Sequence, residues 1–488
     1  MSVIIHGMNK PTEQQQKVIE TVSGVVLVQA CPGSGKTQTL VDRTIALSSN
    51  DRKLVLAFNK KAAEEFASRL NKHGGANADV RTFHSFCLGQ IKKNYKAFGF
   101  AGMPEVETSI PLFKALLAAN DEPWQSWDES PWDEDFIKMA EHTLYDADLA
   151  KIAKGPEKIK SLSGQEGPNP VVLSAKALLK LRQWLVANNK LTFDSMIRLV
   201  AENTNRISWY GQHIMIDEYQ DVDRFQFDIS VAMTKMPGIK SFVVVGDPNQ
   251  RIYEWRGALG DAFGDMSQAF PASVTLPLTV NFRSKDEILA LAETICPVGM
   301  TGVKGSDPKA VVKLAPESGE DKHIVEGANG DLHERAILCR FNRDCMSWGL
   351  RLAKKGIPVM VLGKGDFWST KHIKMAKEAW LKGQRDSSTL FTSKGWTNML
   401  RLSRYQDEEM VNQAMADAAW IMSLSREDMK VIEQSLQNEM GIRVSTIHKV
   451  KGSEYNEVLI HNCDAKLKAD KFVYYVAATR ARNRLVLA

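Results

Sequence analysis

The residues best suited to chemistry are a lysine and a threonine that follow two closely spaced glycines near the start of the chain. Gly33, Gly35, Lys36 and Thr37 come soon after the apolar, β-branched run 25–28. Glycines at this spacing let the backbone curl so that successive N–H groups point at a phosphate. The lysine would supply a charge for the β- and γ-phosphates, and the threonine hydroxyl could bind Mg²⁺. The pattern predicts a loop that binds a nucleoside triphosphate.

The context of this loop supports that interpretation. A buried strand is expected before it, and a helical pattern follows from Thr39. These are the flanks that a phosphate-binding loop requires. The loop departs from the strict pattern only at its first position. The residues expected to surround the phosphates are Ala30, where the strict pattern has glycine, Cys31, Pro32, Gly33, Ser34, Gly35, Lys36 and Thr37.

A pair of carboxylates at the end of another apolar strand would complete the nucleotide site. Asp217 and Glu218 follow the run 213–216. At a strand end, Asp217 would hold Mg²⁺ together with Thr37, and Glu218 would orient and deprotonate the attacking water. An Asp-Glu pair alone is usually a solvated turn. The phosphate loop upstream favours the catalytic interpretation.

The composition describes a globular protein with several domains. Of 488 residues, 44% are hydrophobic and 25% are charged, which is ordinary for globular chains. The net charge is only +5, so affinity for a polyanion would have to come from a local groove. Six scattered cysteines without a CxxC pair argue for reduced thiols and against zinc or iron–sulfur sites. We expect a cytoplasmic protein with no membrane partner, because neither a signal peptide nor a long apolar run is present.

Strands alternate with helical segments along the chain, which predicts parallel α/β sheets. The expected strand segments are 25–28, 54–58, 80–86, 213–218, 241–247, 336–339, 358–362, 443–446, 457–460 and 484–487. They form two groups, before and after about residue 280. Each group is interrupted by a helical, strand-poor stretch, at 91–190 and at 376–440. The first stretch carries an acidic run, expected to be a solvated face, that comprises Asp128, Glu129, Asp133, Glu134 and Asp135.

The phosphate loop and seven further segments, in order along the chain, resemble the motifs of superfamily 1A DNA helicases of the UvrD/Rep/PcrA type. The phosphate loop is the first motif, Asp217–Asp221 resembles motif II, and Val245–Ala258 resembles motif III over its whole length. The remaining segments are Phe58–Glu64 (motif Ia), Thr82–Ser85 (Ib), Asn281–Ser284 (IV), Thr446–Tyr455 (V) and Tyr475–Arg482 (VI). Phe282 stands where the family usually has tyrosine.

The resemblance implies an α/β fold with two RecA-like, parallel-sheet P-loop domains, each carrying a helical insertion. Domain 1A, for ATP and single-stranded DNA, would comprise 1–90 and 191–280, with insertion 1B at 91–190. Domain 2A would comprise 281–375 and 441–488, with a short 2B-like insertion at 376–440. ATP would bridge the two RecA-like domains.

The resemblance also assigns roles around ATP and Mg²⁺. Catalysis would rest on Lys36, Glu218, Gln250, Arg283 and Arg480. The remaining nucleotide contacts would be Gln15 on the adenine (or Gln14, one position away), Phe282 stacked on the base, Gln250 on the γ-phosphate, Arg283 and Arg480 as arginine fingers, and Glu454 on the ribose or γ-phosphate side. Guanidinium forks suit phosphate oxygens and developing negative charge.

A DNA strand would lie on aromatic and polar residues from the same motifs. Aromatic faces stack bases without regard to sequence, and polar side chains contact phosphate or sugar. The expected set is Phe58, Asn59, Thr82, His84, Tyr253, Trp255, Arg256, Thr446 and His448. His84 and His448 lack metal-ligand spacing, so no metal role is assigned to them.

Two functions follow from these motifs. The first is an ATP-dependent single-stranded DNA translocase and helicase, running 3′ to 5′ by resemblance, that acts at single-strand/duplex junctions and can be loaded or activated by a protein partner. The alternative is an ATP-switched single-strand binding module that strips proteins and does not unwind. An RNA strand is a weaker option, because no residue recognisably reads a 2′-hydroxyl.

Overall fold

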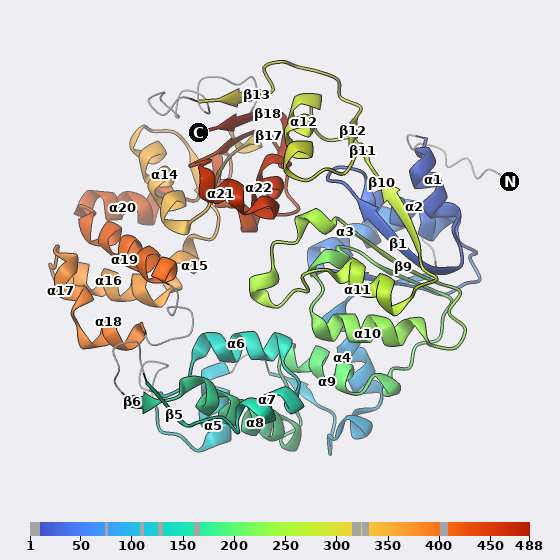
Figure 1. The fold of residues 1–488 in the computed structure, drawn as a ribbon, viewed down its shortest axis with the longest axis horizontal. Coiled ribbons are helices and arrows are strands. Elements are labelled where there is room, and N and C mark those ends of the chain that lie inside the picture. The colour runs from blue at the N-terminus through green and yellow to red at the C-terminus, as the bar shows by residue number, and fades with distance from the viewer. Residues whose placement is uncertain are drawn as a thin grey trace. The chain divides into compact units, whose positions relative to one another are not determined.

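The computed structural model describes residues 10–73, 77–107, 112–124, 130–160, 166–314, 324, 331–400 and 408–488. These residues form two compact units (Figure 1). The described part of unit 1 runs to Ala30 and from Gly35 to Leu278. The described part of unit 2 comprises Cys31–Ser34 and the chain from Thr279 onward.

Unit 1 is built on a sheet of six described strands, and every neighbouring pair is parallel. In sheet order the strands are β10 (Val274–Leu278), β1 (Gly24–Ala30), β9 (Ser241–Gly246), β8 (His213–Ile216), β2 (Lys53–Ala57) and β3 (Ala78–Thr82). Because parallel strands end at the same edge, the segments that follow β1, β2, β3, β8 and β9 gather along one edge of the sheet. These segments hold motifs I, Ia, Ib, II and III.

Both faces of this sheet are covered, as Figure 1 shows. Side chains alternate along β1, so that Val26 and Val28 join one apolar cluster and Leu27 joins the other. The first face is covered by α1 (Glu13–Glu20), α2 (Lys36–Ala46) and α3 (Lys60–Asn71). The second face is covered by α4 (Phe83–Lys93), α9 (Phe193–Glu202), α10 (Arg224–Thr234) and α11 (Ala262–Ala269).

A helical cluster in unit 1 has a core of its own. It contains α5 (Leu112–Asn120), α6 (Glu134–Thr143), α7 (Asp146–Ile152) and α8 (Pro170–Ala187). Among the described residues it also includes two small strand pairs that the sequence did not indicate, namely β4 (Glu105–Val106) with β7 (Lys190–Leu191), and β5 (Lys158–Lys160) with β6 (Glu166–Pro168).

The acidic run in this cluster is not the uniform solvated face that we expected. Asp133 is fully buried, because its carboxylate caps α6 by accepting the Phe136 N–H at 3.0 Å and its own N–H donates to Ser174 at 2.7 Å. Glu134 does pair with Lys138 at the surface. Asp128 and Glu129 lie outside the described residues, as does the side chain of Asp135.

Unit 2 also has a sheet of six described strands in which each neighbouring pair is parallel. In sheet order they are β13 (Val311–Lys313), β18 (Ala481–Leu487), β17 (Tyr455–Ile460), β14 (Arg335–Cys339), β16 (Ile442–Thr446) and β15 (Val359–Val361). Nearby elements are β11 (Val280–Asn281) paired with β12 (Thr301–Gly302), α12 (Asp286–Ile295), α14 (Asn342–Lys354), α21 (Ala465–Ala469) and α22 (Lys471–Ala478).

A second helical group follows β15. It comprises α15 (Lys364–Ser369), α16 (Lys371–Leu381), α17 (Ser387–Phe391), α18 (Lys394–Met399), α19 (Glu408–Ser423) and α20 (Arg426–Ser435). Two polar contacts tie α16 to the α19 region: His372 lies 3.2 Å from Asp417, and the Trp380 indole N–H donates to Leu424 O at 2.8 Å.

The predicted fold class, α/β with parallel sheets, is confirmed. Each strand predicted from an apolar run overlaps an observed strand of one of the two large sheets. The helix after the phosphate loop begins at Lys36, earlier than the predicted Thr39. Edge strand β10 was missed because it is largely exposed and contains Pro277, which weakens a strand pattern. No helix in the described part of the chain is long and apolar enough to cross a membrane.

Candidate nucleotide and nucleic-acid site

The phosphate loop has the backbone that its glycines predict. Gly33 and Gly35 have φ angles of +66° and +77°, in the left-handed region. A Cβ on Gly33 would lie 2.5 Å from the Cβ of Arg283, and one on Gly35 would lie 3.0 Å from Nε2 of Gln15. Gln15, predicted to read the adenine, therefore lies beside the loop. Lys36 opens α2, whose N-terminal N–H groups and dipole favour an anion.

Two hard oxygen ligands lie together next to this loop. The Thr37 hydroxyl donates to Oδ2 of Asp217 at 3.0 Å. Burial first, and then the neighbouring carboxylate of Glu218, raises the pKa of Asp217 above its ordinary value, while Lys36 opposes the rise. A hydroxyl and a carboxylate are ligands that suit Mg²⁺.

The small number of protein ligands available beside the loop fits a magnesium ion whose coordination shell is completed by a nucleotide. Among the described residues, no group of three or more histidines, cysteines or carboxylates could hold a metal. Mg²⁺ typically takes one or two protein ligands and completes its shell with phosphates and water. When bound, it neutralises charge on the phosphates.

A glutamine that our sequence reasoning missed connects motifs II and III. Gln220 Nε2 donates to Glu218 Oε2 at 2.6 Å, and Gln220 Oε1 accepts the Asp247 N–H at 3.0 Å. Asp247 in turn accepts from Gln250 Nε2 at 2.9 Å. Glu218 has a φ of +53°, unusual for a residue other than glycine, so its carboxylate is held by a constrained backbone. Glycine at position 246 leaves room for the Gln220 amide, because a Cβ there would lie 2.1 Å from Gln220 Oε1.

Motif IV residues in unit 2 lie against the first part of the loop, which belongs to the same unit. The Phe282 N–H donates to Gly33 O at 2.9 Å, and Asn281 Nδ2 donates to Pro32 O at 2.6 Å. The Phe282 side chain is 40% exposed, so its ring face is accessible for stacking. Arg283 Nε donates to Glu454 Oε2 at 2.5 Å, which joins two of the predicted nucleotide contacts.

Arg480, the second predicted arginine finger, is in a different environment. Its side chain is buried, and its guanidinium donates to Val476 O at 3.0 Å and Ser453 O at 3.1 Å. The residue therefore joins α22 to the turn before β17. Its predicted contact with phosphate stays a prediction.

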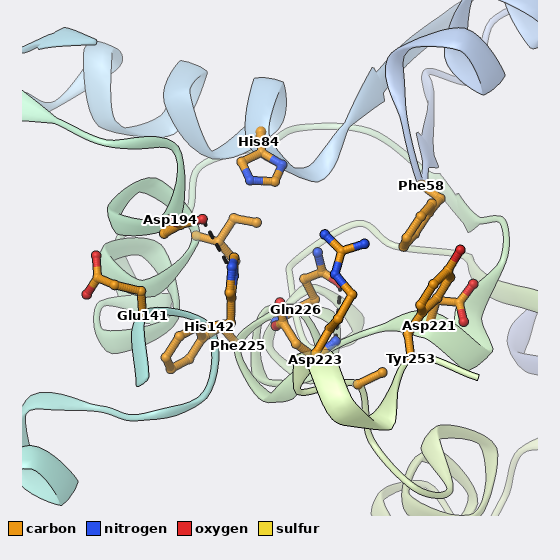
Figure 2. Close-up of a pocket in the computed structure, with 13 residues that line it drawn as sticks. Phe58, His84, Glu141, His142, Asp194, Asp221, Asp223, Phe225, Gln226 and Tyr253 are labelled. Carbon is orange, nitrogen blue, oxygen red and sulfur yellow. Dashed lines mark hydrogen bonds and ion pairs between the residues drawn. The ribbon is translucent and has the colours of Figure 1, made fainter. Parts of the chain in front are cut away.

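Four of the predicted nucleic-acid residues line one cavity of about 260 Å³ in unit 1, shown in Figure 2. They are Phe58, His84, Tyr253 and Arg256. The Phe58 and Tyr253 rings are nearly parallel, with centroids 6.2 Å apart, and the Arg256 guanidinium lies 5.6 Å from the Tyr253 centroid. Phe58 is 41% exposed, so this pair is an accessible stacking surface and not a core contact.

The other side of the cavity contains residues that the motifs did not indicate. His142 Nδ1 lies 3.5 Å from Asp194 Oδ1, and both residues line the cavity. Phe193, which precedes Asp194 and is 53% exposed, meets His84 edge to face at 5.8 Å. Burial first, and then His142, lowers the pKa of His84, so its imidazole is neutral at pH 7 and offers an N–H rather than a charge. Phe193 could have been found from the sequence only as an aromatic residue at the first position of a helix, where a core residue is not expected.

The other predicted strand contacts are distributed over both units. Asn59 and Thr82 cap α3 and α4, respectively, by accepting main-chain N–H groups. Thr446 and His448 belong to unit 2, where Thr446 is buried. Trp255 lies in the short 3-10 helix Glu254–Arg256, but its side chain is outside the described residues.

The fold and the nucleotide loop together define a P-loop protein with two RecA-like sheets. The UvrD/REP helicase N-terminal domain matches residues 11–271, and the UvrD-like helicase C-terminal domain matches residues 441–488. The chain belongs to the UvrD/REP helicase family, which confirms the resemblance found in the motifs.

Named relatives are similar at low identity. The chain is 25% identical over 410 residues to the ATP-dependent DNA helicase PcrA of Staphylococcus epidermidis, covering 77% of this chain and 53% of that protein. The ATP-dependent DNA helicase PcrA of Bacillus subtilis is 25% identical over 408 residues, which cover 76% of this chain and 52% of that protein. A probable DNA helicase II homolog of Mycoplasma genitalium is 27% identical over 314 residues, which cover 58% of this chain and 42% of that protein. The chain thus matches about half the length of the PcrA relatives.

Proposed function

We propose that this protein is an ATP-dependent motor that moves along single-stranded DNA, 3′ to 5′, and unwinds duplex at a junction. ATP with Mg²⁺ would bind at Lys36, Thr37 and Asp217, and Glu218 would activate the attacking water. The expected domains, insertions 91–190 and 376–440 included, are part of this proposal. So is a protein partner that loads or activates the motor.

One observation carries the proposal: motif III runs directly from the nucleotide site to the stacking surface. Asp247 and Gln250 are bonded to each other at 2.9 Å and linked to Glu218 through Gln220. Tyr253, only three residues further along, stacks on Phe58. A change at the γ-phosphate that moves Gln250 would therefore move the aromatic surface, which is what a coupled motor needs.

The test is steady-state ATP hydrolysis with no polymer, single-stranded DNA, duplex DNA or single-stranded RNA. We expect strong stimulation by single-stranded DNA alone. Duplexes with a 3′ or a 5′ tail then separate unwinding from translocation and give the polarity. Stimulation without unwinding of either duplex would favour the protein-stripping alternative. No stimulation by any polymer would mean that the motor needs a partner or is a switch, and the ATP-switched binding module would become the favoured function.

A further inference from the structure

The helical cluster of unit 1 reaches into the stacking cavity through the last turn of α6. Glu141 and His142 line the cavity together with Phe58, Tyr253 and Arg256. Figure 2 shows His142 joined to Asp194, the second residue of α9, on the side of the cavity away from Phe58 and Tyr253. One wall of the predicted strand site is thus supplied by the helical cluster.

The next residue of α6 packs against the motif III turn. Gly257 has a φ of +92°, and a Cβ built on it would lie 2.2 Å from Cγ2 of Thr143. The Thr143 hydroxyl donates back to Met139 O at 2.8 Å. The methyl group therefore fills the space beside Gly257. The turn itself is short, because the N–H of Gly257 donates to Glu254 O at 2.9 Å.

A buried arginine holds this end of α6 in place. Arg182, on α8, is 2% exposed, and its guanidinium donates to Ala140 O at 3.2 Å and Leu144 O at 3.0 Å. Ala140 lies in the last turn of α6 and Leu144 directly follows the helix, so the cation also sits at the C-terminal end of the helix dipole, where it is favourable. Arg182 additionally pairs with Glu141 at 3.0 Å and with Asp146 at 2.8 Å.

The helices that cover the sheet bind the start of α7, which follows α6 directly. Arg198, on α9, pairs with Asp146 at 3.2 Å and with Glu202 at 2.6 Å. Arg224, on α10, pairs with Asp148 at 2.8 Å. The start of α7 is therefore held by the helices that cover the sheet, whereas the main-chain carbonyls at the end of α6 are bonded by Arg182.

We propose that the last turn of α6 positions the stacking surface for the strand, with the Thr143 methyl as the contact on Gly257 and Arg182 as the residue that holds the turn. This inference rests on the proposed function, because it concerns how the motor holds DNA. Thr143 and Arg182 are positioning residues, since neither reaches the nucleotide. The helical cluster would then be needed for strand affinity even though ATP binds elsewhere on the unit.

The first test removes a single methyl group. Thr143→Ser keeps the hydroxyl and loses Cγ2, whereas Thr143→Val keeps the methyl and loses the hydroxyl. We expect Thr143→Ser to raise the single-stranded DNA concentration for half-maximal ATPase about twofold to fourfold, because one fully buried methyl corresponds to about fourfold and Thr143 is partly buried. The rate without DNA and the melting temperature should stay near those of the wild type, and Thr143→Val should behave as the wild type.

A matched control is present at the end of α10. Thr234 is also the last residue of its helix, with its hydroxyl bonded back to Val231 O at 2.7 Å, and it is not among the residues that line the cavity. Thr234→Ser should leave the DNA dependence unchanged. Equal half-maximal concentrations for Thr143→Ser and wild type, or equal losses in Thr143→Ser and Thr143→Val, would overturn the inference. A wild type that DNA does not stimulate would instead refute the proposed function.

The second test compares two buried arginines. Arg182→Lys and Arg198→Lys each replace a planar fork by a point charge, so both should lower the melting temperature. Only Arg182 holds the end of α6, so only Arg182→Lys should raise the half-maximal DNA concentration, by about threefold or more. If both variants or neither changed it, the positioning role of Arg182 would be wrong.

Discussion

At the scale of single residues, the candidate catalytic side chains are held by polar neighbours. Gln220 fixes the Glu218 carboxylate on one side and the Asp247 main chain on the other. Asp247, itself buried, fixes Gln250. Preorganised groups of this kind lower a barrier because they need not reorient during the reaction. The site therefore depends on residues that touch no substrate.

Lys36→Ala should abolish DNA-stimulated hydrolysis and leave single-strand binding largely intact. The lysine would neutralise charge that develops on the transferred phosphate, so we expect a loss of roughly 100-fold or more in kcat. Hydrolysis assays and fluorescence anisotropy with a labelled oligonucleotide would measure the two properties. Lys61→Ala, at an exposed lysine of α3, is the control. Near-normal turnover in Lys36→Ala would refute the nucleotide site.

Arg480→Ala should lower both hydrolysis and stability. The buried guanidinium satisfies the carbonyls of Val476 and Ser453, and its removal would leave them without that donor. Arg283→Ala should reduce hydrolysis with a smaller loss of stability, because its partner Glu454 is partly exposed. Melting temperatures measured together with hydrolysis rates distinguish the two variants. Equal melting of Arg480→Ala and wild type would contradict this account.

The stability of the fold should fall in mild acid, partly through His84. Because the pKa of His84 is lowered, the folded state binds fewer protons than the unfolded chain. Stability from this group is therefore present above the ordinary histidine pKa, about 6.5, and lost as the pH falls below it. In urea titrations at pH 7, 6 and 5, His84→Gln should lose less unfolding free energy than the wild type. Parallel losses would show that His84 does not contribute.

The residues that could be read from the sequence were those in short consecutive motifs. Lys36 and Thr37 sit in one loop, and Asp217 was recognisable from its strand end. By contrast, His142 reaches the stacking cavity from a helix far away in the chain, and only tertiary packing brings it there. A periodicity argument cannot place such a residue.

At the scale of elements, the stacking surface is a product of two loops at one sheet edge. Phe58 directly follows β2, and Tyr253 comes from the segment after β9. Each loop alone would present one exposed ring. Because the sheet brings the two loops together, the Phe58 and Tyr253 rings hold each other in place while they stay outside the core.

Tyr253→Ala should raise the DNA concentration for half-maximal ATPase by about tenfold and leave the rate without DNA unchanged. Base stacking on an aromatic ring is worth roughly 1–3 kcal/mol. Tyr253→Phe keeps the ring and should match the wild type. If Tyr253→Ala lowered the ATPase rates with and without DNA equally, the ring would stabilise the fold and would not bind the DNA strand.

The elements that were predicted well are continuous apolar strands of the two sheets. A strand such as β8, buried on both faces, is a run of apolar residues that needs no partner to be recognised. The missed elements are short or exposed, as β13 and β10 are, so burial left little pattern in their residues. Thr12 caps α1, and the full capping box with Gln15 is present.

At the scale of the whole molecule, each unit has its own parallel sheet, so unfolding should show two transitions. Phe242 is buried on β9 in unit 1, and Ile337 is buried on β14 in unit 2. Truncation of either to alanine should cost roughly 2–5 kcal/mol and lower only the transition of its own unit. Scanning calorimetry would measure both. Val22→Ala, at a half-exposed position, is the control. A single transition lowered equally by both core variants would contradict this expectation.

The sheet order of unit 1 has a consequence for how the protein is made. Strand β1, which carries the phosphate loop, pairs with β9 and with β10 (Val274–Leu278). At a synthesis rate of about 5–20 residues per second, β1 would leave the ribosome roughly 12–50 s before β10 does. For most of that time the apolar strand β1 has neither of its permanent neighbours, because β9 (Ser241–Gly246) emerges only shortly before β10. The candidate phosphate loop is thus synthesised long before its sheet is completed, and β1 stays open to non-native pairing until Leu278 has emerged.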